Sequence, residues 1–165
     1  MELINESSEK FRDKQEELCG FLFELLRKIN ILEKEIYERM QELRAKNEKL
    51  GIPKNQVGPG EKELKGKYKE RLGEIVIPAC TEKLIGKRYG SSFGNPQKYG
   101  YIDGDCKAIF IMKTAGRAVV ETYYKQGVDS KHKFVLRDVG GIWLLDEVYY
   151  GFASDGDKWY SDNVR

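Results

Sequence analysis

The chain has 165 residues, of which 34% are charged and 40% are apolar. This balance is typical of a soluble globular domain with a core of its own, and it argues against an intrinsically disordered chain. No apolar run is long enough to span a bilayer. The net charge of +2 is too small for the strong basic stripe of a nucleic-acid-binding protein.

Charge is unevenly distributed along the chain, and the cysteines and first residues indicate the cellular compartment. Residues 51–88 carry nine basic and five acidic side chains, whereas residues 146–165 carry five acidic and two basic ones. Cys19, Cys80 and Cys106 are too widely spaced for a disulfide framework or a metal motif. The first residues, MELINESSEKF, lack the basic start and apolar core of a signal peptide. We therefore expect a reduced, cytoplasmic protein.

A long amphipathic helix is predicted from about residue 8 to residue 49, because apolar residues recur there in steps of three, four and seven. Its apolar stripe consists of Phe11, Leu18, Leu22, Leu25, Ile29, Leu32, Ile36, Met40, Leu43 and Leu50. The stripe is widened in the middle by Phe21, Phe23, Leu26 and Ile31. This widening favours a helix that lies on a sheet. A coiled coil is the competing interpretation, since the seam is nearly heptad.

Residues 51–60, GIPKNQVGPG, contain two prolines and three glycines and therefore predict a loop. A second helical segment is predicted over residues 61–88, with Pro78 either kinking it or starting a short third helix. The exposed face of this segment is basic, with Lys62, Lys65, Lys67, Lys69 and Arg71. A solvated helix face is the simplest interpretation of these side chains.

The pattern changes to period two after residue 105, which predicts an antiparallel meander over residues 105–152. Its last hairpin joins two apolar-rich runs at Gly140-Gly141, a dipeptide suited to a two-residue turn. We expect Trp143 and Leu145 to anchor this hairpin against the long helix. The order of elements predicts a single α+β domain: one long helix (residues 1–50) and one or two further helices on a curved antiparallel sheet of at least four strands, followed by a tail at residues 153–165.

The sequence contains no convincing set of acid and base side chains. The only histidine, His132, lies between two lysines, which indicates an exposed hairpin end rather than a catalytic site. Asp146 and Glu147 are adjacent, so on a regular strand they would face opposite ways and could not act as a pair. Glu121 is either a salt-bridged strand residue or a buried general base. We expect no enzymatic turnover.

Two Asp-Gly-Asp stretches, at residues 103–105 and 155–157, resemble parts of calcium loops. Neither stretch has the further oxygen ligands that such loops need, so turns are predicted at both places. None of the cysteines has a histidine nearby in the sequence, and buried small side chains are their expected role. We expect no metal and no cofactor.

The second half of the chain resembles the nuclear-transport-factor-two-like fold, in which a strongly bent antiparallel sheet wraps a long helix into a cone with an open pocket. The resemblance rests on the hairpin sequence FVLRDVGGIWLLDEV, residues 134–148. The preceding stretch CTEKLIGKRYGSSFGNPQKYGY, residues 80–101, is similar to immunity proteins built on this fold. Those bacterial proteins are encoded beside polymorphic toxins and neutralise the cognate toxin by binding it.

This resemblance implies a non-catalytic immunity protein whose partner is a cognate toxin, for which a basic, nuclease-type domain would fit the acidic tail. We expect no direct contact with nucleic acid or with a membrane, and a homodimer is left open. Aromatic side chains of the loop at residues 86–105 would supply anchor area, and acidic side chains of the tail would attract a basic surface. The predicted contacts are Tyr89, Phe93, Tyr99, Tyr101, Asp155, Asp157, Trp159 and Asp162. The alternative is a small-molecule-binding protein or an isomerase- or dehydratase-type enzyme that uses the cone pocket.

Overall fold

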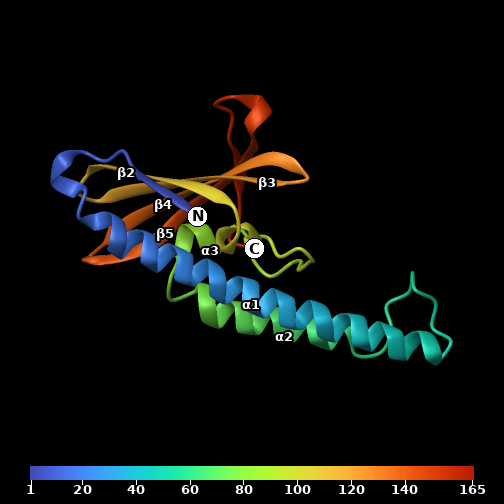
Figure 1. Cartoon of the computed structure of the whole chain (residues 1–165). Coiled ribbons are helices and arrows are strands. Elements are labelled where there is room, and N and C mark those ends of the chain that lie inside the picture. Colours follow the sequence, from blue (N-terminus) through green and yellow to red (C-terminus); the bar gives the residue numbers. More distant parts are fainter.

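A computed structural model describes residues 1–165 as an α+β protein whose helices lie along one face of an open sheet (Figure 1). The helices are α1 (Lys14–Lys49), α2 (Glu61–Val76) and α3 (Glu82–Ile85), with short 3-10 turns η1 (Glu9–Phe11), η2 (Gly100–Asp103) and η3 (Ala153–Asp155). The strands are β1 (Glu2–Asn5), β2 (Cys106–Thr114), β3 (Arg117–Gln126), β4 (Val128–Val139), β5 (Ile142–Phe152) and β6 (Tyr160–Asp162).

The sheet has six strands in the order β1-β2-β3-β4-β5-β6. The predicted meander is confirmed, because β2 to β5 pair in sequence and antiparallel. Gly140 and Gly141 form its last turn with φ angles of 63° and 87°, which only glycine adopts without strain. Two additions were not predicted: the short strand β6 on one edge, and β1, which pairs parallel to β2 and makes the sheet mixed.

A bulge in β5 changes which face of the sheet its side chains point to. Val135 lies opposite Glu147 and Leu136 lies opposite Leu145, so Asp146 is an extra residue in the strand. Both acids therefore reach Lys83: its ammonium lies 3.7 Å from Asp146 and also pairs with Glu147. The prediction that these adjacent carboxylates face opposite ways is wrong, because it assumed a regular strand.

The bulge also sets the surroundings of Asp146, which is 3% exposed. Burial by itself disfavours the charged form of this carboxylate, but hydrogen bonds from Thr81 and Arg137 outweigh burial, and the pKa of Asp146 is lowered. The pair of acids with Lys83 and Arg137 is thus an ion-pair cluster that fixes α3 to β5.

The first half of α1 packs on the inner face of the sheet, the face turned toward the helices. Phe110, Val120 and Phe134 form one row across β2, β3 and β4 on this face, and all three are fully buried. Of the residues that widen the stripe, Phe23 and Leu26 are buried as predicted, Phe21 is half-buried, and Ile31 is 69% exposed. The helix begins at Lys14 rather than near residue 8, because the preceding backbone extends along β2 as far as the hydrogen bond from Ser8 to Met112.

The second half of α1 runs past the sheet and pairs with α2 (Figure 1). The predicted loop at residues 51–60 turns the chain between them, and α3 is the short third helix after Pro78. None of these helices combines the length and apolar composition needed to cross a bilayer. Of the two predicted anchors of the last hairpin, Leu145 is fully buried and Trp143 is half-buried against the core.

All three cysteines are unpaired and buried. Burial raises the pKa of the Cys19 and Cys80 thiols to about 12, so both stay protonated near neutral pH. They act as small apolar side chains, as the sequence indicated.

Two isoleucines of α1 provide a matched test of this packing, since Ile29 is fully buried and Ile31 is 69% exposed. We expect Ile29→Ala to lower the free energy of unfolding by about 2–5 kcal/mol, because it leaves a cavity in the core. Ile31→Ala makes the same change of helix propensity and should alter stability by no more than about 0.5 kcal/mol. Urea titration measures both, and equal losses would show that α1 does not lie on the sheet in this orientation.

Candidate partner-binding site at the open end of the sheet

The loop that follows α3 meets the last residues of the chain at the open end of the sheet, where β4 begins and β5 ends. Lys98 pairs with Asp162 at 2.9 Å, and Lys87 donates a hydrogen bond to Ser161 at 2.8 Å. The Gly90 amide donates to the Arg165 carbonyl. The loop at residues 86–105 and the end of the tail therefore form one surface.

A buried carboxylate holds this surface to α1. Glu33 is fully buried, and it accepts a hydrogen bond from the Lys98 amide at 2.9 Å and from the Arg165 side chain at 2.5 Å. One turn earlier, Asn30 accepts from the Tyr99 amide at 3.2 Å. Residues 30 and 33 of a single helix turn thus fix both the loop and residues 160–165.

The four loop aromatics predicted as partner contacts turn toward the interior. They are Tyr89, Phe93, Tyr99 and Tyr101. Tyr99 is fully buried, and Tyr101 is buried in a stack on Tyr124 with ring centroids 3.6 Å apart. Phe93 and Tyr89 are half-buried, and Phe93 meets Tyr68 edge to face. The loop closes the inner side of the sheet, and Tyr99 and Tyr101 leave little surface for a partner.

His132 lies inside this aromatic cluster, where it is 4% exposed. Its Nδ1 atom is 3.1 Å from the Tyr124 hydroxyl, and its ring stacks with Tyr101. Burial, with a smaller contribution from Lys98, lowers the pKa of His132 to about 3, so the imidazole is neutral near pH 7. The expected exposed position is wrong for a simple reason: the two flanking lysines point to the outer face of the strand, which turns the residue between them inward.

The acidic tail is divided between the two faces of the sheet. Residues 153–159 stand on the outer face, on the opposite side from the helices (Figure 1), and Trp159 lies over the ammonium groups of Lys131 and Lys133 at 4.3 and 4.1 Å. Lys131 also donates to the Gly156 carbonyl. Asp157 is exposed and makes no ion pair. Of the other two predicted acids, Asp155 belongs to the same outer-face segment and Asp162 lies in β6.

Asp155 and Asp162 differ in their freedom to meet a partner. Asp155 accepts a hydrogen bond from Tyr160 at 3.3 Å, and no ammonium or guanidinium group pairs with it. Asp162 is already neutralised, since its carboxylate pairs with Lys98. Of the three predicted acids, Asp155 and Asp157 therefore carry the uncompensated charge.

The aromatics that reach solvent at this end are ones that the sequence did not single out. Tyr150, Phe152 and Tyr160 are 39%, 40% and 41% exposed, and they form a connected cluster, here called the mouth patch. Cross-strand pairing places Tyr150 beside Tyr160 and opposite His132, so these side chains share the inner face at its open rim. Tyr150 and Phe152 also help to line a pocket of about 380 Å³.

The sheet half of the sequence is rich in aromatic residues. Which of them are exposed depends on strand register and on the bulge in β5, and neither has a sequence signal. No three His, Cys, Asp or Glu side chains gather in a group able to hold a metal ion. Comparison of the chain with protein-family profiles, curated proteins and solved structures finds no match.

Because His132 is the only histidine, its burial should be visible in the pH dependence of stability. The unfolded chain takes up a proton there below about pH 6.5, whereas the folded protein does so only near pH 3. Stability from this group is complete above pH 6.5 and is lost as the pH falls toward 3. We expect the free energy of unfolding to be about 2 kcal/mol lower at pH 5 than at pH 7.

The control is His132→Gln, which removes the titrating group and should give a nearly flat profile between pH 5 and pH 7. Asp146 and Glu147 do not interfere, because their pKa values are lowered and they titrate below this window. A wild-type profile as flat as that of the variant would mean that His132 is accessible to solvent.

Proposed function

We propose that the protein is a non-catalytic immunity protein that binds and neutralises the cognate toxin domain of a bacterial polymorphic toxin system, on a nuclear-transport-factor-two-like framework. The observation that carries the proposal is the mouth patch: three clustered, partly exposed aromatic rings at the rim of the sheet. Tyrosine and phenylalanine combine large contact area with little conformational freedom, and such residues anchor protein interfaces.

Charge on the chain segment between Phe152 and Tyr160 of the mouth patch supports the same partner. Asp155, which is hydrogen-bonded to Tyr160 of the mouth patch, makes no ion pair, and neither does Asp157, which is exposed on the outer face two residues further along the chain. Uncompensated carboxylates next to apolar anchors speed the approach of a basic surface and orient it. A toxin domain that cleaves nucleic acid offers such a surface, because its substrate is a chain of phosphates.

The filled inner face favours surface binding over a function inside a cone. Tyr99, Phe134 and Val164 are fully buried there, so the space between sheet and helix is occupied by the protein's own side chains. The resemblance of residues 80–101 to immunity proteins adds to this argument, because that stretch builds the loop on which the open end depends.

A small-molecule site is the second candidate, and the pocket of about 380 Å³ beside the mouth patch favours it. His132, Tyr124 and Asp162 border that pocket. A histidine whose pKa is lowered to about 3 is a weak proton acceptor, so ligand binding suits this pocket better than acid–base catalysis.

The first test removes the aromatic anchors. Phe152→Ala combined with Tyr160→Ala should weaken binding of the toxin domain encoded by the neighbouring gene by about 30-fold or more, as loss of interface anchors does. Isothermal titration measures the affinity. The matched control is Val139→Ala with Ile142→Ala, which removes exposed apolar side chains from the other end of the same hairpin. Equal affinities for the two double variants would place the interface elsewhere.

The second test removes the free charge. Asp155→Asn combined with Asp157→Asn should slow association several-fold at low salt and have little effect at high salt, because steering by exposed charges is screened. Stopped-flow fluorescence measures the rate. Asp162 is left intact because it pairs with Lys98. The control Glu38→Gln with Glu42→Gln makes the same change of net charge on α1. If this control slows association equally, Asp155 and Asp157 have no special role in binding.

A further inference from the structure

The paired ends of α1 and α2 extend beyond the sheet as an arm, defined here as residues 37–67. Ile36 is the last residue of α1 in the continuous core, and Tyr68 is the first of α2. Between them the two helices pack mainly on each other, and Figure 1 shows them reaching well past the strands. The arm therefore projects from the body outside the continuous core.

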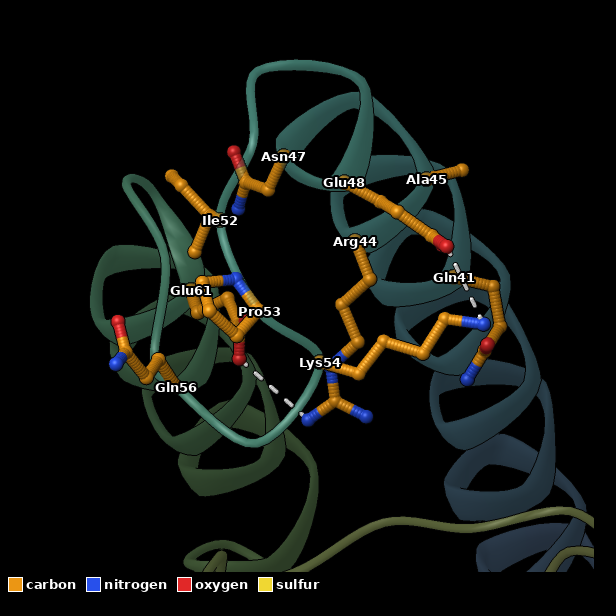
Figure 2. Close-up of a pocket in the computed structure, with 10 residues that line it drawn as sticks. All are labelled: Gln41, Arg44, Ala45, Asn47, Glu48, Ile52, Pro53, Lys54, Gln56 and Glu61. Atoms are coloured by element: carbon orange, nitrogen blue, oxygen red, sulfur yellow. Dashed lines mark hydrogen bonds and ion pairs between the residues drawn. The ribbon is translucent and has the colours of Figure 1, made fainter.

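The distal end of the arm has a fixed shape. Asn47 and Glu61 are buried there, and Asn47 donates a hydrogen bond to the Pro59 carbonyl at 3.3 Å. Gly58 packs so closely that a Cβ atom on it would lie 2.2 Å from the Asn47 amide nitrogen. Figure 2 shows Arg44 reaching from α1 toward Glu61, beside a pocket of about 290 Å³. The loop is therefore held as a defined tip.

Two aliphatic side chains project from this tip into solvent. Leu50 is 76% exposed and Val57 is 70% exposed, which places them among the most exposed large apolar residues of the chain. Leu50 follows the end of α1, and Val57 lies in the loop before α2. A surface that met the end of the arm would remove both side chains from water.

The positive charge of the arm gathers around the same tip. Four basic side chains of the arm are neutralised by ion pairs: Arg39, Arg44, Lys54 and Lys67. The four that make none are Lys46, Lys49, Lys62 and Lys65, all exposed and all in the last turn of α1 or the first turns of α2. The two acids of the arm that make no ion pair, Glu38 and Glu42, lie nearer the body.

We propose that the tip of the arm binds the surface of an anionic lipid bilayer, with Leu50 and Val57 entering the interface and the four free lysines meeting lipid phosphates. An anionic lipid surface supplies both chemistries that the tip presents, an apolar layer and a dense field of negative charge. This surface contact needs no spanning helix. It departs from the expectation of no membrane contact, which rested on the lack of an apolar run.

The kind of cation favours lipid over nucleic acid or an acidic protein. All the free cations at the tip are lysines, whereas directional recognition of phosphates and carboxylates relies on the planar fork of arginine. Protein interfaces are depleted in lysine and enriched in aromatic residues, and the loop at residues 50–60 has no aromatic residue. Mobile point charges suit the fluid, non-directional array of headgroups in a bilayer.

The test is co-sedimentation of the full chain with vesicles, which requires no toxin and so stands apart from the proposed function. We expect binding to vesicles of phosphatidylglycerol and phosphatidylcholine in equal parts, and none to phosphatidylcholine alone. Lys49→Gln with Lys62→Gln and Lys65→Gln should weaken binding about 100-fold, given the usual contribution of a lysine near an anionic surface. Leu50→Ser with Val57→Ser should weaken binding at high salt, where the charge contribution is screened.

The matched control is Lys107→Gln with Lys113→Gln and Lys125→Gln, which removes the same charge from exposed positions of the sheet. This variant should keep most of the affinity. Similar losses for the two triple variants would overturn the proposal in favour of attraction by net charge alone. Binding to duplex DNA or RNA but not to anionic vesicles would assign the arm to nucleic acid instead. Unchanged melting temperatures confirm that the variants fold.

Discussion

A single buried carboxylate, that of Glu33, decides how the open end of the molecule is built. A fully buried acid needs partners, and here they come from two distant segments: the Lys98 amide of the loop and the Arg165 side chain. Satisfying Glu33 therefore requires the loop and the last residues to lie together on α1. Burial also lowers the pKa of Lys98, whose pairing with Asp162 offsets that cost. The position of the mouth patch therefore depends on these polar contacts.

The length of α1 explains the division of the molecule into a body and an arm. Its 36 residues span roughly 54 Å, whereas β4, the longest strand with 12 residues, spans roughly 40 Å. The helix must overhang the sheet, and α2 packs along it. One amphipathic helix thus serves two neighbours, which is why its stripe continues to Met40 and beyond.

The elements with strong periodicity could be predicted from the sequence, and the remaining features depend on tertiary context. Both long helices, the meander and the Gly140-Gly141 turn follow from local pattern and turn chemistry. Four residues are too few to mark β1 as a strand, and nothing in the sequence of β5 marks Asp146 as a bulge. Tyr99 turns inward because Asn30 and Glu33, which lie far away in the sequence, hold the loop. The loop itself could therefore be predicted, but the direction of its aromatic side chains could not.

The parallel pairing of β1 has a consequence for the order of folding. β1 pairs with Lys107–Phe110 of β2. It therefore cannot pair until a segment about a hundred residues further along the chain has been synthesised. The helices and the hairpins of β2 to β5 close short loops and can form without it, whereas β1 must close a loop of about a hundred residues. Until then the free edge of β2 offers unpaired amides and carbonyls to any other extended chain. Docking of β1 both completes the sheet and ends that exposure.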